Sequence, residues 1–231
     1  MPINPRIKQD LHDRLNEPRA FDLMNMFKGI PLVYKATLLA LDNDSVKFEV
    51  EPPSSVCLNW ESHTIILDDR NTNAIRARVI EFDVIKGIVH LDDLGYFDRG
   101  MSHRTSVRVE SEEPIPATII RGEESVSAVV IDVSLTGFGI RVPTPSKVAL
   151  NLNDYVRVSL KMMELLVAPR GTIVNIRKEN GFNRLAFRFA EDVTIPVAIA
   201  RYVIHRRAEI HREIRNAYYT AYTKENPSHT S

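Results

Sequence analysis

The sequence is poor in cysteine, and this scarcity excludes disulfide cross-links within the chain. Its 231 residues include a single cysteine, Cys57, in the apolar segment SVCLNW. A free thiol among apolar residues is typical of a packed core position in a reducing compartment. We therefore assign Cys57 to packing and expect a cytoplasmic protein.

An excess of positive charge is also missing. Lys+Arg and Asp+Glu both number 30, so the formal net charge is zero. Domains that bind nucleic acid or anionic membranes through bulk charge normally carry a basic excess. The composition therefore argues against nucleic acid as a partner, although it allows a local basic pocket.

Long apolar runs and catalytic signatures are missing as well. No stretch approaches 18 consecutive apolar residues, and the charged N-terminus has no signal-peptide core, so we expect no direct membrane insertion. The sequence contains no HExxH, CxxC, clustered carboxylates, nucleophile elbow or Walker loop. We accordingly expect no catalytic residues, no metal site, no cofactor and no enzymatic activity.

The sequence does contain many short β-type runs. It is 44% hydrophobic and 26% charged, which is typical of globular proteins, and its length suits two domains. Between residues 30 and 94, apolar runs alternate with turn clusters such as DND and PPSS, and a second β block covers residues 104–192. We predict a mainly β fold with two small antiparallel β-barrels. The predicted strands of the first block are PLVYKATLLALD, SVKFEVEP, SVCLNW, HTIILDD, AIRARVIEFD and GIVHLDD.

Helices are predicted at both ends of the chain. Residues 1–29 are predicted to be a helical segment, with one helix before Pro18 and another amphipathic turn at Phe21 to Phe27. A long helix is predicted over residues 193–224, which could cover the barrel, dock a partner or form a homodimer. Its apolar face comprises Ile199, Val203, Ile210, Ile214, Ala217 and Ala221, and its polar face comprises Arg201, His205, Arg206, Arg207, Arg212 and Arg215. Residues 95–103 are predicted to be a hinge, and residues 225–231 a disordered tail.

Two polar motifs lie in the second β block, one at its start and one between two of its predicted strands. The first, RTSVR, contains Arg104 and Arg108, whose side chains share one face in an extended chain. The second, DVSLTG, is a predicted turn that contains Asp132, Ser134 and Gly137. Two guanidinium groups suit phosphates and the face of a base, while a carboxylate and a hydroxyl suit a guanine edge. Glycine permits a positive φ and a close approach of backbone to ligand, so the motifs together predict a guanine nucleotide site.

RTSVR followed by DVSLTG resembles the RxxxR and (D/N)xSxxG signature of PilZ domains, which bind the bacterial second messenger cyclic di-GMP. The resemblance implies that Arg104 and Arg108 hold phosphates and stack on guanine, while Asp132, Ser134 and Gly137 hold a guanine from the barrel side. Many PilZ proteins carry an arginine where this chain has His103. This difference leaves open whether one or two nucleotides bind.

Two other interpretations use the motif residues. An adaptor PilZ protein would bind protein partners alone, and its motif residues would form an ordinary basic linker and turn. A barrel that binds single-stranded RNA needs exposed stacking aromatics, which a 7% aromatic content disfavours. A second RxxxR pair, Arg184 and Arg188 in FNRLAFRF, is interpreted as solvated charge on a strand. We accordingly expect Arg184→Ala to leave binding unchanged.

The two β blocks resemble each other at a constant offset. An ungapped alignment pairs Phe48 with Ile140, so the offset is 140 − 48 = 92, and Pro53 then meets Pro145. We expect two copies of one barrel; the alternative is that any two small barrels share alternating apolar residues. In this register Asp132, Ser134 and Gly137 fall on Ala40, Asp42 and Ser45, so the first barrel should lack the site.

The domain order also resembles flagellar-brake PilZ proteins, in which an N-terminal barrel precedes the binding domain. This resemblance implies a role in motility, with a protein partner such as a flagellar motor component. The arginine motif lies where the predicted hinge enters the second barrel, so we expect the nucleotide to contact both and to change the arrangement of the two barrels. Motility, biofilm and surface-structure control are the outputs that the sequence leaves open.

Overall fold

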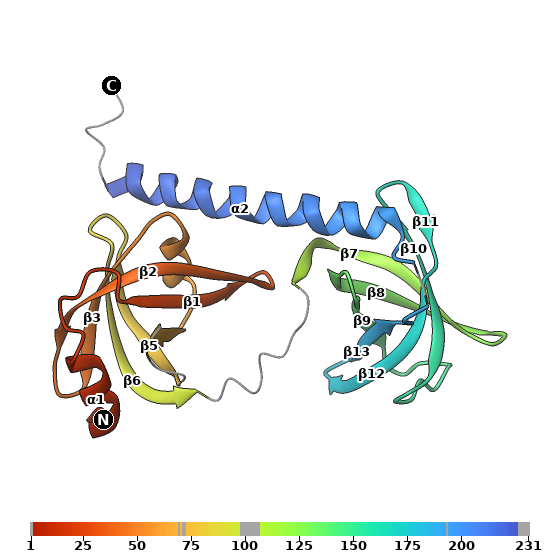
Figure 1. Cartoon of the computed structure of the whole chain (residues 1–231). Coiled ribbons are helices and arrows are strands. Elements are labelled where there is room, and N and C mark those ends of the chain that lie inside the picture. Colours follow the sequence, from red (N-terminus) through yellow and green to blue (C-terminus); the bar gives the residue numbers. More distant parts are fainter. Residues whose placement is uncertain (1, 69, 71–72, 98–106, 193, 226–231) are drawn as a thin grey trace. The chain divides into compact units, whose positions relative to one another are not determined.

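The computed structural model describes residues 2–68, 70, 73–97, 107–192 and 194–225. It divides into two compact units: residues 1–27, 31–104 and 210–231 form the first, and residues 28–30 and 105–209 form the second. The first unit contains one β-barrel and the second contains another (Figure 1). The predicted mainly β fold, with a short N-terminal helix and a long C-terminal helix, is confirmed.

The first barrel is closed, with the strand order β1-β2-β3-β6-β5-β4. Its elements are α1 (Pro5–His12), β1 (Phe21–Phe27), β2 (Ile30–Leu41), β3 (Ser45–Val50), the 3-10 helix η1 (Ser54–Asn59), β4 (His63–Asp68), β5 (Ala74–Asp83) and β6 (Ile88–Phe97). Alternate residues point inward, as expected for strands with one buried face. Phe21 and Phe48 meet edge to face in the core, with ring centroids 5.4 Å apart, and Ile7 and Leu11 of α1 are fully buried.

Two predicted elements of the first barrel are wrong. Phe21–Phe27 is a strand, not a helical turn, because Phe21, Leu23 and Asn25 are buried at a period of two. This strand pairs with β4 and closes the barrel. The segment SVCLNW is the 3-10 helix η1, not a strand, since Val56, Cys57 and Leu58 are buried consecutively instead of alternately.

Cys57 packs in the core of the first barrel, as expected. Its thiol is 0% exposed and lies 4.0 Å from the Tyr34 hydroxyl, which in turn donates a hydrogen bond to Asn25 Oδ1 at 2.7 Å. Burial raises the pKa of the Cys57 thiol to about 12. The thiol is therefore protonated at neutral pH, and a thiol in this state is a poor nucleophile.

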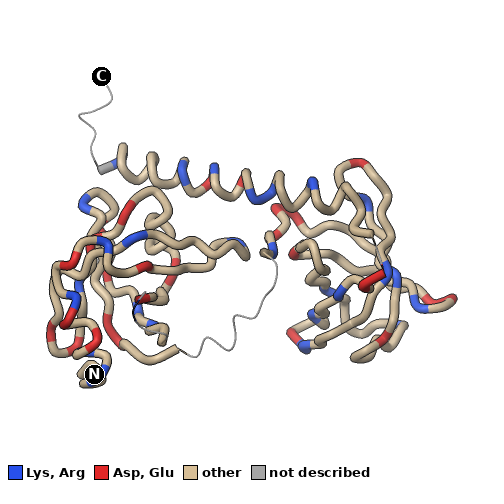
Figure 2. Tube along the Cα trace, in the orientation of Figure 1, with Lys and Arg blue, Asp and Glu red and all other residues tan. Residues whose placement is uncertain are grey.

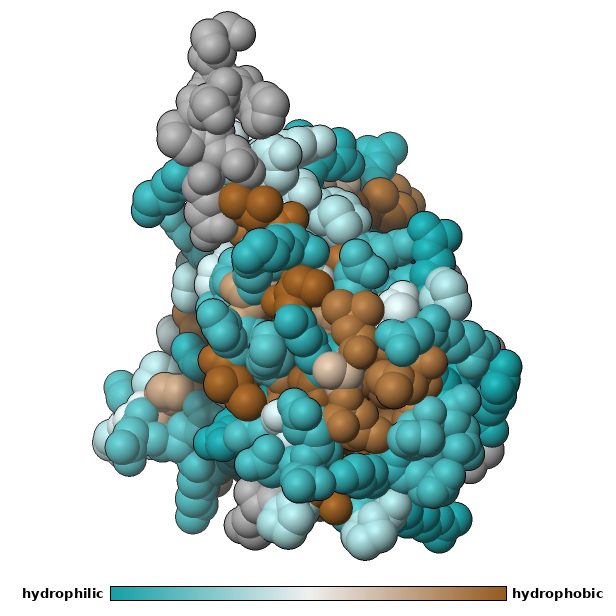
Figure 3. Space-filling model, turned by 90° about the vertical axis from the view of Figure 1, so that its left-hand side faces the viewer, coloured by the Kyte–Doolittle hydropathy of each residue, from teal (hydrophilic) through white to brown (hydrophobic). Residues whose placement is uncertain are grey.

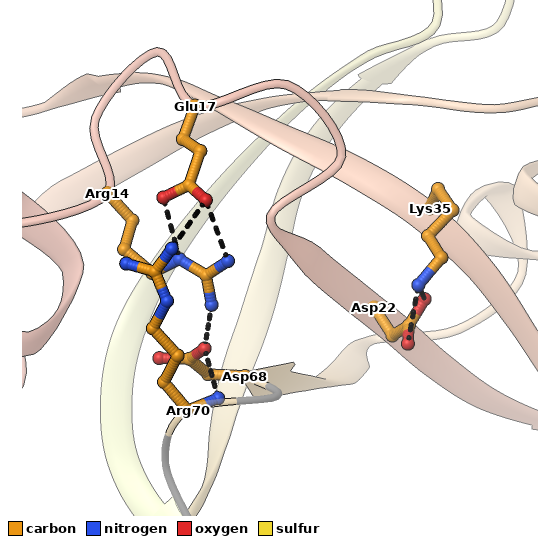
Figure 4. Close-up of polar contacts among 6 residues, drawn as sticks. All are labelled: Arg14, Glu17, Asp22, Lys35, Asp68 and Arg70. Atoms are coloured by element: carbon orange, nitrogen blue, oxygen red, sulfur yellow. Dashed lines mark hydrogen bonds and ion pairs between the residues drawn. The ribbon is translucent and has the colours of Figure 1, made fainter.

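A buried arginine joins the chain after α1 to the first barrel (Figure 4). Arg14 is 5% exposed and forms ion pairs with Glu17 and Asp68, and its guanidinium lies 5.4 Å from the Phe21 ring centroid. A buried charge is tolerated when it is paired and hydrogen-bonded. These contacts account for the burial of Arg14 through structure, without requiring a ligand.

The second barrel has the sheet order β11-β10-β12-β13-β9-β8-β7, and β10 also pairs with β7. Its strands are β7 (Arg108–Arg121), β8 (Glu124–Ser134), β9 (Gly137–Pro143), β10 (Tyr155–Met162), β11 (Leu165–Val167), β12 (Arg170–Glu179) and β13 (Phe182–Phe189). Phe138, Phe187 and Phe189 contact one another in its core. The predicted strand FNRLAFRF is thus confirmed as β13.

The two barrels share a strand order. If β7, β8, β9, β10, β12 and β13 stand for β1 to β6 in turn, both barrels have the same neighbours, with β11 as an addition. Each also has a register shift at the same place: after Leu38, opposite Phe48, and after Val130, opposite Ile140. These positions differ by the offset of 92, so the structure supports two copies of one barrel.

The C-terminal helix α2 covers Val197–Glu225. Its predicted apolar residues Ile199, Val203, Ile210 and Ile214 are buried. Arg206, expected on the polar face, is instead 3% exposed, because its Nε donates a hydrogen bond to the Glu110 carbonyl at 3.0 Å and its Nη1 pairs with Glu209. No helix in the described part of the chain is long and apolar enough to cross a membrane.

Charged and apolar groups are mixed over the surface. Both signs of charge occur on each barrel, and α2 carries several basic residues (Figure 2). On the face of the first barrel that Figure 3 presents, apolar side chains gather among hydrophilic ones. Apolar atoms make up more than half of an ordinary protein surface, so this face alone indicates no partner.

Candidate functional site

The predicted site residues meet at one end of the β7–β8–β9 sheet. Arg108 is the first residue of β7 and lies opposite Ser134, the last residue of β8, which in turn lies opposite Gly137. Asp132 is on the same face of β8, two residues earlier. His103 and Arg104 lie outside the described residues. The structure therefore brings together Arg108, Asp132, Ser134 and Gly137.

Asp132 is a buried carboxylate between two arginines. Its side chain is 7% exposed, and Arg108 Nη1 lies 3.6 Å from Oδ1. Arg184 Nη2 donates a hydrogen bond to Oδ2 at 3.2 Å. Among the described residues, Oδ1 has no hydrogen-bond donor. A buried acceptor without a donor is costly, by about 1–3 kcal/mol, so this oxygen is suited to a ligand that brings an N–H group.

Arg184 belongs to this cluster: it is an exposed strand residue, as expected, but its pairing with Asp132 was not predicted. It extends from β13, across β9 from Asp132, and its side chain is 44% exposed. The strand pattern predicted that Arg184 faces outward, but it could not show which carboxylate shares that face. Arg188, the other member of the pair, is exposed and lies opposite Gly137.

Ser134 and Gly137 shape the turn. Ser134 is 0% exposed, and its Oγ donates a hydrogen bond to the Gly137 carbonyl at 3.0 Å and accepts one from the Thr136 amide at 3.3 Å. Gly137 does not have the positive φ that we expected. Its lack of a Cβ is required for another reason: a Cβ there would lie 1.9 Å from the Phe187 carbonyl oxygen.

Gly139 makes room for the Asp132 carboxylate, a role that the motif did not reveal. It lies directly opposite Asp132 on β9, and a Cβ at this position would lie 2.0 Å from Asp132 Oδ2. The sequence signal was the repeat GFG, which places two glycines on one face of a strand at period two. Gly137 and Gly139 form a glycine strip on β9, between β8 and β13, and the Asp132 carboxylate occupies the space above Gly139.

The resulting surface is basic around one recessed acceptor. Arg108, Arg184 and Arg188 border the glycine strip, and the exposed Glu110 lies opposite Asp132 on β7. The arginines can hold phosphate oxygens or stack on a flat base, and Asp132 can accept paired N–H groups. The described residues contain no cluster of three or more His, Cys, Asp or Glu side chains that could hold a metal ion.

The comparisons with known proteins concern the second barrel and the fold. A family model described as "PilZ domain" matches residues 102–205. Solved structures with a similar fold include YcgR from Escherichia coli in complex with c-di-GMP, at 16% identity over 93% of this chain and 96% of that chain, with a TM-score of 0.45. The Bacillus subtilis inhibitor of motility MotI/DgrA matches at 10% identity over 83% of this chain and 97% of that chain, with a TM-score of 0.43.

A third structure is the complex of MrkH from K. pneumonia with c-di-GMP. It matches at 13% identity over 90% of this chain and 94% of that chain, with a TM-score of 0.44. No curated protein matched the chain.

Proposed function

Residues 102–205 are a PilZ domain, and on this premise we propose that the chain is a receptor for cyclic di-GMP. The observation that carries the proposal is the Asp132 carboxylate, which is buried, flanked by Arg108 and Arg184, and provided with an Oδ1 that lacks a donor. A guanine edge presents an N1–H and an amino group side by side, and these match the two oxygens of one carboxylate.

The geometry also suggests what must move when the nucleotide binds. Oδ1 is buried and Arg108 Nη1 stands 3.6 Å from it, which is longer than a hydrogen bond. A guanine reaches Asp132 when Arg108 turns away, and a phosphate of the same ligand is then the better partner for that guanidinium. Arg104 and His103 are proposed to complete the ligand contacts from the segment before β7, and Ser134 and Gly137 to hold the turn that presents Asp132.

The proposed output is regulation of a partner, without catalysis. A ligand held by both the RxxxR segment and the barrel face favours the arrangement of the two barrels in which both can reach it. The partner is proposed to be a cytoplasmic protein of motility, biofilm or surface-structure control, such as a flagellar motor component. The exposed basic residues of α2 are proposed to serve partner docking or formation of a homodimer.

Isothermal titration of the full chain with cyclic di-GMP tests the receptor proposal. We expect saturable binding, and GTP titrated under the same conditions serves as the control ligand. One nucleotide per chain would indicate that His103 does not support a stacked pair, whereas two would indicate that it does. No binding to a folded protein would contradict the receptor proposal and favour the adaptor alternative, in which the chain binds protein partners alone.

A further inference from the structure

Three arginines lie in a row on the outer face of the second barrel. Arg177 on β12 is directly opposite Arg184 on β13, which is directly opposite Arg141 on β9. Like charges opposite each other on neighbouring strands destabilise a sheet. Within the part of the chain that the structure describes, Arg177 and Arg141 have no ion pair, and Arg184 has one with Asp132.

A surface pocket adjoins this row. It has a volume of about 310 Å³ and is lined by Ser127, Ala128, Val129, Arg141, Pro143, Gly181 and Phe182. The Arg141 guanidinium lies over the Phe182 ring, 4.6 Å from its centroid, and Arg141 Nε is buried without a hydrogen-bond partner among the described residues. The pocket therefore combines a flat cationic wall with apolar sides, which suits a planar base.

The fold does not require this row. The equivalent positions in the first barrel follow from the shared strand order, in which Ile88 lies between Asp83 and Glu49 on three neighbouring strands. Asp83, Ile88 and Glu49 thus take the places of Arg177, Arg184 and Arg141, in that order. The first barrel has the same strand order without arginines at these places, so the strand order does not require the row.

The row lies within reach of a ligand bound at Asp132. Arg141 is two residues along β9 from Gly139, which is opposite Asp132, and two residues of a strand cover about 7 Å. Arg184 links the two places, since it bonds to Asp132 and lies opposite Arg141. A ligand with two bases and two phosphates can therefore contact Asp132 and the pocket beside Arg141 at the same time.

From this geometry we propose that Arg177, Arg184, Arg141 and Phe182 form a second half-site for the distal guanylate of the cyclic dinucleotide. This inference rests on the proposed function. The base distal to Asp132 enters the pocket beside Arg141 and Phe182, and the phosphate that leads to it is held by Arg184 and Arg177. Ligand binding would then relieve the mutual repulsion of the three arginines.

The test compares Arg141→Ala and Arg177→Ala with Arg157→Ala in the full chain, by titration with cyclic di-GMP at low and at high salt. Arg157 on β10 is a matched control, because it is exposed and also faces an arginine, Arg170, but lies away from the pocket. We expect about a tenfold weaker affinity for each half-site variant at low salt, a smaller loss at high salt because screening weakens the row, and no change for Arg157→Ala.

The readouts separate failure of this inference from failure of the proposed function. Affinities of both half-site variants within twofold of the wild type would overturn the half-site and leave the receptor intact. A wild-type protein that binds no cyclic di-GMP would overturn both. Arg177 is exposed, has no ion pair among the described residues and faces Arg184, so its variant should unfold at or above the wild-type temperature. A weaker affinity together with a lowered unfolding temperature would indicate a structural role and count against the half-site.

Discussion

The two barrels place different residues on the same hairpin. In the first barrel the bulged hairpin carries Ala40 opposite Lys47, and in the second barrel the equivalent hairpin carries Asp132 opposite Gly139. A lysine at the glycine position would fill the space that the Asp132 carboxylate now occupies. The difference shows that one barrel frame accommodates or excludes a recessed acceptor through a pair of facing residues.

The comparison extends to charge. The row Arg177, Arg184 and Arg141 of the second barrel corresponds to Asp83, Ile88 and Glu49 in the first. The strand order is the same, yet two of the three arginines are replaced by carboxylates and the third by an isoleucine. Residues that leave the strand order unchanged thus differ between the two barrels, which is the general relation between a scaffold and a site built on it.

The largest expected loss of affinity follows from Asp132→Ala, which gives the second barrel the alanine that the first barrel has at the equivalent position, Ala40. Asp132→Ala removes both oxygens that are proposed to accept guanine donors. Two charge-assisted hydrogen bonds are worth about 1.5–3 kcal/mol each, so we expect the affinity for cyclic di-GMP to fall by at least about 100-fold. Titration calorimetry measures this change.

Its control is Asp92→Ala in the first barrel, which removes a carboxylate that is likewise paired with an arginine, Arg78. Binding should be unchanged in this variant. A loss of affinity in Asp92→Ala equal to that in Asp132→Ala would break the comparison.

A smaller effect is expected when the room for the carboxylate is removed. Gly139→Ala places a methyl group 2.0 Å from Asp132 Oδ2, so the carboxylate must shift. We expect binding at least about tenfold weaker, and overpacking that lowers the free energy of unfolding by about 1–3 kcal/mol. Gly95→Ala on β6 is the matched control, because a Cβ there meets nothing within 4 Å. Wild-type affinity in Gly139→Ala would mean that Asp132 does not hold the ligand.

Arg108→Ala should weaken binding about tenfold, because one charge-assisted contact to the ligand is lost. The side chain is 34% exposed, so its loss should change the unfolding temperature little. Arg184→Ala, expected from the sequence to be neutral, should now weaken binding as well, since Arg184 bonds to Asp132. Equal affinities of the wild type and Arg108→Ala would place the site elsewhere.

The smallest expected effect concerns pH and the first barrel. The side-chain hydrogen bond from Arg78 lowers the pKa of Asp92. A lowered pKa means that the folded state favours the ionised carboxylate, so the pair stabilises the fold above the unfolded pKa of about 3.9 and loses this effect as the pH falls through the folded value. Asp92→Asn should lower the unfolding temperature slightly at pH 7 and leave it unchanged near pH 2. Thermal melts at the two pH values decide this.

Much of the fold and of the candidate site could be predicted from the sequence, and the predictions that were wrong or incomplete have physical reasons. The strand pattern and the offset of 92 placed Asp132 on Ala40, and the shared bulge agrees with that register. The segment Phe21–Phe27 was wrongly predicted as helical, because the periodicity of seven residues is too short to separate a helix from a strand. Its pairing with β4, which closes the barrel, decides for a strand. Motif spacing located Asp132. It could not show that Arg184 contacts Asp132 or that Gly139 leaves room for the carboxylate, because both residues lie outside the motif.

Amide hydrogen exchange of the full chain, with and without saturating cyclic di-GMP, tests the central claim most directly, because it reports on both barrels in one sample. We predict slower exchange in the segment 132–141 and in β13 when the nucleotide is bound, and no change in the equivalent hairpin at 40–49. Protection of residues 40–49 with none at 132–141 would contradict the assignment of the site to the second barrel.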